Sequence, residues 1–276
     1  MKIIIAEHYG ICFGVRDAIG AAEQAAAHGP VSVLGELVHN PVVRERLALR
    51  GVMEAPLNGA PRSTRAMITA HGTSDSQRER WRDAGLELLD GTCPLVRHAH
   101  TQLRLLVQFG YFPVVIGKQN HVEVVGLTGD FPSSVVIEIE EQIDSLPPEP
   151  RFGIISQTTQ PLDRVLRIVA AIRKARPQAD VRFVDTVCRP TKDRQAALRK
   201  LLVETDTIVI VGGRASNNTR ELVETVRAAG KRAIHVERAD ELSRSTFAGL
   251  TSVGVSAGTS TLRETVEQVV RRLEEF

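Results

Sequence analysis

The stretch KIIIAEHYGIC at residues 2–12 decides the fold, because an apolar, strand-like run leads through a short polar turn to a single cysteine. The same order returns in LELLDGTC, which ends at Cys93, and in VRFVDTVC, which ends at Cys188. Cys12, Cys93 and Cys188 are 81 and 95 residues apart, and each interval is close to one third of the 276 residues. We therefore predict three repeated units that each present one thiol to a shared centre.

Composition narrows the classes of protein that this chain can belong to. A hydrophobic content of 42% with 25% charged residues is ordinary for a globular protein, and the net charge of +2 gives no basic field for nucleic acid. No run approaches the ~20 apolar residues that span a bilayer, so we expect no membrane partner. Three cysteines without local pairing disfavour a disulfide framework and predict a reducing, cytoplasmic location.

Apolar runs rich in Val and Ile alternate with longer amphipathic runs, the pattern of small, mostly parallel sheets covered by helices. Strands are expected at 2–6, 31–35, 52–55, 66–70, 86–89, 112–116, 134–138, 152–156, 181–184, 207–211, 232–236 and 252–256. Helices are clearest at 15–28, 94–109, 161–175, 190–205, 219–229 and 261–274. The fold class is thus α/β, with three units related by a pseudo-threefold axis around a central cavity.

The third unit lacks its last strand, and the start of the chain supplies it. In the first two units, a helix, a His-containing loop and a small-polar loop are followed by a strand and the next cysteine. The third unit stops after its final helix, so we predict that the N-terminal strand completes the C-terminal sheet. The expected units are 13–93, 94–188, and 189–276 together with 1–12.

The unusual polar residues follow the carboxyl ends of predicted strands, where open α/β sheets bind ligands. Three thiolates without a C-x₂₋₄-C pair suit an iron–sulfur cluster better than structural zinc, and would leave one iron open. Imidazoles, hydroxyls and amides in the neighbouring loops form a candidate anion site without any lysine. These residues are His39, His71, His121, Thr158, Ser216, Asn217, Asn218 and Ser260. Glu123, two residues after His121, is the candidate acid–base group.

No P-loop and no G-x-G-x-x-G occurs at a strand–helix junction, so no nucleotide cofactor is expected. Two further classes of protein stay open beside an iron–sulfur enzyme. A non-catalytic iron–sulfur sensor would need the cysteines but not the histidine and Ser-Asn set. A zinc hydrolase of a phosphorylated substrate would use Glu123 as general base.

Taken together, the motifs resemble those of the 4-hydroxy-3-methylbut-2-enyl diphosphate reductase family, over nearly the whole chain. They are GICFGV (10–15), ELVHN (36–40), AHGTS (70–74), DGTCPLV (90–96), NHVE (120–123), SQTT (156–159), VC..T..RQ (187–195), SNN (216–218) and SAGTS (256–260). Each is weak alone, whereas the ordered set with three single cysteines is specific. The segment after Cys188 retains Thr191, Arg194 and Gln195 of the family pattern.

The resemblance implies a [4Fe-4S] cluster on Cys12, Cys93 and Cys188, which would become [3Fe-4S] on degradation. It implies that the polar loop residues bind a diphosphate, that Glu123 donates a proton and that Thr158 assists it. The implied reaction removes an allylic hydroxyl reductively and yields isopentenyl and dimethylallyl diphosphates, the last step of the non-mevalonate isoprenoid pathway. Electrons would come from a ferredoxin or flavodoxin.

Two positions depart from the family pattern. Many bacterial members carry Pro where this chain has Val122, and a second acid where it has Val125. Neither position is a cluster or phosphate position, so the expectation stands.

Overall fold

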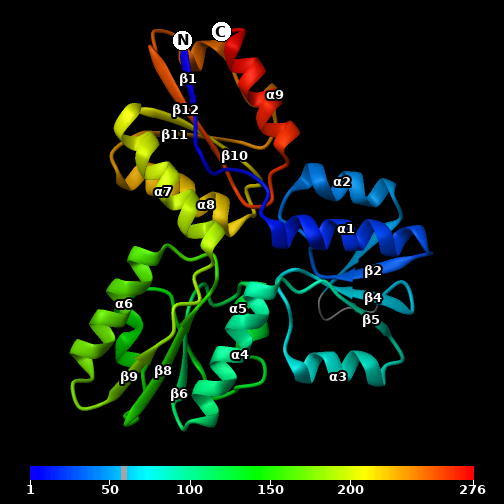
Figure 1. Cartoon of the computed structure of the whole chain (residues 1–276), viewed down its shortest axis with the longest axis vertical. Helices are drawn as coiled ribbons and strands as arrows, with labels where there is room; N and C mark the ends of the chain where they lie inside the picture. Colours follow the sequence, from blue (N-terminus) through cyan, green and yellow to red (C-terminus); the bar gives the residue numbers. More distant parts are fainter. Residues whose placement is uncertain (57–60) are drawn as a thin grey trace.

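The computed structural model describes residues 1–56 and 61–276. The described chain forms three lobes around a common centre, each a four-stranded sheet flanked by helices (Figure 1). All recorded strand pairs are parallel, and the strand order is equivalent in the three sheets. This confirms the predicted α/β fold of three pseudo-threefold-related units.

The first lobe is built on the sheet with order β3-β2-β4-β5. Its strands are β2 (Val31–Leu34), β3 (Val52–Ala55), β4 (Arg65–Ile68) and β5 (Glu87–Asp90). Its helices are α1 (Phe13–Ala27), α2 (Pro41–Leu49) and α3 (Asp75–Asp83). Proline at the first position of α2 and the cap bond from Val42 N–H to Asn40 Oδ1 explain why that helix begins there.

The second lobe repeats this arrangement with the order β7-β6-β8-β9. Its strands are β6 (Phe112–Ile116), β7 (Val135–Ile137), β8 (Arg151–Ser156) and β9 (Asp180–Phe183). Its helices are α4 (Pro94–Gln108), α5 (Val122–Thr128), α6 (Leu162–Ala175) and the 3₁₀ turn η1 (Glu140–Ser145).

The third lobe joins the two ends of the chain, with the order β11-β10-β12-β1. Its strands are β1 (Lys2–Ile5), β10 (Thr207–Val211), β11 (Arg232–Val236) and β12 (Ser252–Ala257). Its helices are α7 (Arg189–Glu204), α8 (Asn217–Ala228) and α9 (Arg263–Glu274), with 3₁₀ turns η2 (Ala239–Glu241) and η3 (Arg244–Phe247). Strand β1 pairs in parallel with β12, Lys2 opposite Ser252, so the predicted closure by the N-terminal strand is confirmed. The division at 13–93, 94–188 and 189–276 plus 1–12 stays our proposal.

The sequence pattern did not single out α2, α3 and α5 as clear helices. Helices α2 and α3 have nine residues each. Helix α3 buries only Trp81, so its sequence has too few apolar residues for a helical period to be recognised. Helix α5 has seven residues and is almost wholly apolar, which periodicity alone does not distinguish from a strand. The last helix begins at Arg263, two residues later than expected.

Each sheet carries apolar packing on both faces, as parallel sheets require. The central strands are the most buried, and all five residues of β10 are inaccessible. Truncating a central residue such as Ile210 to alanine would cost about 2–5 kcal/mol of stability. In the described part of the chain, no helix is long and apolar enough to cross a membrane.

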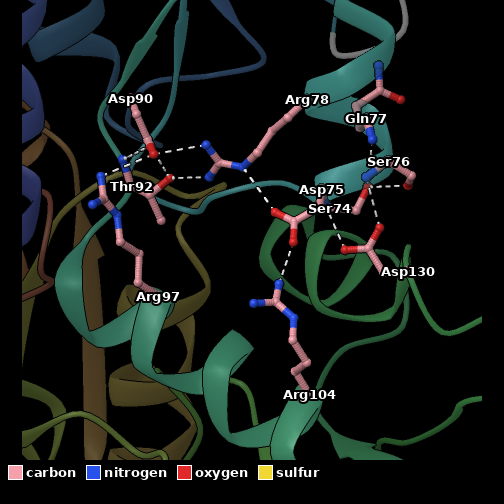
Figure 2. Close-up of polar contacts among 10 residues, drawn as sticks. All are labelled: Ser74, Asp75, Ser76, Gln77, Arg78, Asp90, Thr92, Arg97, Arg104 and Asp130. Carbon is pink, nitrogen blue, oxygen red and sulfur yellow. Dashed lines mark hydrogen bonds and ion pairs between the residues drawn. The ribbon is translucent and has the colours of Figure 1, made fainter. Parts of the chain in front are cut away.

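Polar contacts fix the first lobe against the second (Figure 2). The carboxylate of Asp130, from the second lobe, accepts hydrogen bonds from the backbone N–H groups of Asp75 at 2.7 Å and Ser76 at 2.9 Å. These groups open α3, so the contact satisfies donors that the helix itself leaves free. Arg104 of α4 pairs with Asp75 beside them.

Candidate functional site

The three cysteines occupy equivalent places at the centre of the molecule. Cys12, Cys93 and Cys188 are the N-cap residues of α1, α4 and α7, one helix from each lobe. None of them caps its helix through its side chain, and none forms a disulfide. The sulfur of Cys188 lies 3.1 Å from the hydroxyl of Thr191. A helix N-terminus favours negative charge, which suits a thiolate.

The backbone of each cysteine is tied to the small-polar loop of its neighbouring strand. The N–H groups of Cys12, Cys93 and Cys188 donate to the carbonyls of Thr259, Ala70 and Thr158 at 3.1, 3.0 and 2.9 Å. The threefold repeat therefore extends from the sheets to the hydrogen bonds that place the thiols.

The segment after Cys12 packs against the thiol of the second lobe. A methyl group at Gly14, two residues after Cys12, would collide with the sulfur of Cys93, so only glycine fits there. Burial raises the pKa of the Cys93 thiol and raises that of Cys188 to about 11. The thiols of Cys93 and Cys188 are thus protonated in the metal-free chain, and a metal must displace those two protons to bind.

Three imidazoles from two lobes meet at one place. The ring centroids of His39 and His71 lie 5.1 Å apart. The ring centroid of His121 lies 6.0 Å from that of His39 and 5.5 Å from that of His71. Burial, followed by repulsion from the other rings, lowers the pKa of His71 well below its usual range. Burial and the neighbouring His39 lower the pKa of His121 to about 3. His71 and His121 are therefore neutral at pH 7 while the site holds no anion.

Hydrogen bonds assign the protons of two of these rings. Nδ1 of His121 accepts from the N–H of Glu123 at 3.1 Å, so its neutral ring carries the proton on Nε2. Nδ1 of His39 donates to Glu36 Oε2 at 2.7 Å. For Nε2 of His39 to donate as well, that ring must carry both protons.

The third lobe supplies amides and hydroxyls opposite the histidines. Ser216 caps α8 through its side chain, which accepts from the N–H of Thr219, and Asn217 and Asn218 form the first turn of the helix. Buried polar atoms without a partner in the described structure include Asn217 Nδ2 and Ser260 Oγ. Because buried polar groups are normally paired, these two donors point to a ligand of this cavity.

Glu123 is buried behind the histidines, with 1% of its surface exposed. Its carboxyl group accepts two hydrogen bonds from Thr158, from the N–H at 2.7 Å and from the hydroxyl at 3.1 Å. Burial raises the pKa of Glu123 to about 7, although the bonds from Thr158 oppose the shift. A carboxyl group with a pKa near neutrality can both donate and accept a proton under physiological conditions.

The structure brings most of the predicted polar residues into one cavity. It is lined by Val15, Leu37, Val38, His39, His71, His121, Thr159, Ser216, Asn217, Asn218, Thr259 and Ser260. Thr158 does not line it but lies beside Glu123, and Thr159 takes the place at the wall. The sequence prediction named only Thr158 from the SQTT motif, because sequence alone could not say which of its two threonines lines the cavity.

The sequence model of the LytB protein family matches residues 3–274. The chain belongs to the LytB family. Two LytB relatives named 4-hydroxy-3-methylbut-2-enyl diphosphate reductase are each 36% identical to it. The one from Aquifex aeolicus covers 100% of this chain and 97% of its own length, and the one from Dictyoglomus thermophilum covers 99% and 96%.

Solved structures of LytB enzymes share the fold. The E-1-hydroxy-2-methyl-but-2-enyl-4-diphosphate reductase of Plasmodium falciparum superposes with a TM-score of 0.91 at 26% identity, over 98% of this chain and 87% of that one. A structure titled (E)-4-hydroxy-3-methyl-but-2-enyl diphosphate reductase, the terminal enzyme of the non-mevalonate pathway, gives 0.71 at 35% identity, with both chains fully covered.

The thiol set of this LytB chain fits a cluster better than a single ion. Zinc bound at about 2.3 Å by three thiolates in a tetrahedral site would hold the sulfurs about 3.8 Å apart. Among the residues that the structure describes, a set of ligand atoms all within 4.8 Å of one another is formed by the three histidines, and not by the cysteines. Wider spacing leaves room for a polynuclear cluster. The sensor and zinc hydrolase alternatives find no support among the relatives.

Proposed function

We propose that this LytB chain removes the hydroxyl group of 4-hydroxy-3-methylbut-2-enyl diphosphate reductively, giving isopentenyl and dimethylallyl diphosphates. The observation that carries the proposal is the meeting of three groups of different chemistry at one centre. Three free thiols, a cavity of polar donors and a buried acid with a pKa near 7 converge there from all three lobes. The relatives named for this reaction cover nearly the whole chain.

The cavity residues provide the proposed diphosphate grip. Among the described residues that line the cavity there is no lysine or arginine, so neutral donors and imidazoles that take up protons would meet the charge on the diphosphate. His39, His71 and His121 line this cavity together with the first turn of α8 and Ser260. A bound diphosphate also fixes the position of the carbon chain attached to it. This restraint on the carbon chain is the larger part of a positioning effect.

Cys12, Cys93 and Cys188 are the proposed ligands of a [4Fe-4S] cluster. Their placement at three helix N-termini, with Gly14 against the sulfur of Cys93, suits an anionic group of several atoms. Such a cluster, when bound, supplies single electrons and a Lewis-acidic iron without a cysteine.

Glu123 is the proposed proton donor to the departing hydroxyl oxygen. At pH 7 the protonated form is well populated because the pKa is about 7. The Thr158 hydroxyl donates to Oε2, so it holds the carboxyl group in one orientation, and the next residue, Thr159, lines the cavity. Thr158 also accepts from the Cys188 backbone, which fixes the acid relative to that thiol.

We also propose a ferredoxin or flavodoxin as electron donor, since the two electrons must arrive singly. The three free thiols suit a reducing compartment and are the basis for a cytoplasmic location.

The direct test is anaerobic turnover of the hydroxymethylbutenyl diphosphate with dithionite and a viologen. We expect product formation, a brown chromophore, and iron with acid-labile sulfide in the purified protein. Cys188→Ala is the matched variant, expected to lose both iron and turnover. Colourless protein that contains zinc, or a wild type that binds a full cluster without forming either product, would contradict the proposal.

A further inference from the structure

Arg194 is a buried cation beside two of the three cysteines. It lies on α7, six residues after Cys188, and only 5% of its surface is exposed. Two of its nitrogens donate to backbone carbonyls, those of Pro190 at 2.8 Å and Gly10. Its Nε is buried and has no partner within the described residues.

A buried guanidinium normally pairs with a carboxylate, because an uncompensated charge is costly to remove from water. Asp193 is the nearby acid, but its side chain is 29% exposed and accepts from Arg189 Nε at 2.7 Å. The other negative charge that can act on Arg194 comes from the thiols of Cys12 and Cys188. Thiolates, and whatever anionic group they hold, are therefore the partners that this cation lacks.

The two carbonyl contacts also connect separate parts of the chain. Gly10 belongs to the turn that ends at Cys12, and Pro190 belongs to the first turn of α7, which begins after Cys188. One side chain thus bridges the segments that carry two of the three thiols. The planar guanidinium is suited to this bridge, since it donates in several fixed directions at once.

We propose that Arg194 is a positioning residue that clamps the Cys12 turn to the start of α7 and compensates the negative charge of the group held by the thiolates. The proposal rests on the proposed iron–sulfur function. Because a reduced cluster carries one more negative charge than an oxidised one, a nearby fixed cation favours reduction. Arg194 would make electron uptake by the site easier without touching the substrate.

The reduction potential of the bound cluster tests the charge. Arg194→Gln is expected to lower the equilibrium constant for one-electron reduction about tenfold, equal to about 59 mV for a one-electron couple. Arg194→Lys keeps the charge and should stay close to the wild-type potential. Arg199→Gln is the control, because it removes a 54% exposed arginine from the same helix and should leave the potential unchanged. A midpoint titration followed by electron paramagnetic resonance measures all four proteins.

Amide hydrogen exchange of the metal-free protein tests the clamp. Residues 8–12 should exchange faster in Arg194→Gln and Arg194→Lys than in wild type or Arg199→Gln. If Arg194→Gln retains both the wild-type potential and the wild-type exchange rate, the proposal is wrong. If Arg194→Gln binds no cluster, the potential is measured on Arg194→Lys instead. If Arg194→Lys binds no cluster either, amide hydrogen exchange alone decides the proposal. A wild type without a cluster would refute the proposed function alone, because exchange still reports on the clamp.

Discussion

The polar residues that line the cavity form two groups of different chemistry, a histidine wall and an amide wall. The first and second lobes contribute His39, His71 and His121, and burial lowers the pKa of the last two. The third lobe contributes amides and hydroxyls, which keep the same donors at any physiological pH. The pseudo-threefold fold therefore repeats the positions of the site but not its chemistry.

This difference separates two tasks. The amide wall can recognise the shape of a diphosphate, whereas the histidine wall can also compensate the negative charge of the diphosphate by taking up protons. The acid lies on the histidine side, because Glu123 follows His121 at the start of α5. Proton chemistry is thus confined to the first two lobes, and the following predictions test that separation.

The largest effect is expected from Glu123→Gln. The variant keeps the size of the side chain and a partner for Thr158 but cannot supply a proton, so turnover should fall about 10²–10⁴-fold. Cluster content and affinity for inorganic pyrophosphate should stay close to wild type. Steady-state kinetics and iron analysis check this, and unchanged turnover would remove Glu123 from the reaction.

The same substitution should alter the pH dependence of stability in the metal-free protein. The pKa of Glu123 rises on folding from 4.5 to about 7, so its contribution is fully present below about pH 4.5 and is lost as the pH rises through 7. Relative to wild type, Glu123→Gln should gain about 2–3 kcal/mol between pH 5 and pH 8.5. Urea unfolding at the two pH values measures it, and parallel curves would contradict the raised pKa.

On the histidine wall, His71→Asn should weaken pyrophosphate binding about 10–100-fold at pH 6.5, as expected for a lost hydrogen bond to a charged group. The pKa of His71 lies well below 6.5 in the free site, and a bound anion raises it, so binding takes up protons. Wild-type affinity should therefore increase as the pH falls. Calorimetry in buffers of different ionisation enthalpy should record fewer protons taken up by the variant.

On the amide wall, Asn217→Ala should weaken pyrophosphate binding only about 2–10-fold, the value of a neutral hydrogen bond. Its proton uptake should equal that of wild type, because no titrating group has changed. A variant that lost the pH dependence would show that the two walls are coupled rather than separate.

The smallest effect is expected from Val122→Pro, which restores the residue that many bacterial family members carry. Val122 is the first residue of α5, where proline is favourable and its missing N–H is not needed. The free energy of unfolding should change by less than about 1 kcal/mol, and turnover should stay within about twofold. A large loss would mean that the His121–Glu123 contact depends on valine.

Sequence patterns were sufficient for the repeated parts of the molecule. The strand predicted at residues 2–6 was expected in the C-terminal sheet because an element was missing there, and β1 pairs with β12 as predicted. The cysteines and the polar loops were found through their equivalent places after strands. Repetition and strand polarity are properties of the chain that can be read without coordinates.

Contacts between lobes could not be predicted in the same way. Asn40 Nδ2 donates to the carbonyl of Ser260 at 2.8 Å, although 220 positions separate the two residues. Gly213 lies so close to the His39 carbonyl that a side chain there would collide with it. Arg194 likewise carried no signal beyond its place in a family pattern. Its role depends on the direction of its side chain and on the turn at Gly10, which lies near the other end of the sequence.

The pairing of the first strand with β12 imposes an order on assembly during synthesis. The segment that ends at Cys12 is synthesised about 240 residues before its sheet partner at residues 252–257. A growing chain can complete the sheets that lead to Cys93 and Cys188 while the Cys12 thiol still has no place to dock. Cofactor insertion that needs all three ligands must therefore wait until residues 252–257 have been made and the third lobe can close over the first strand.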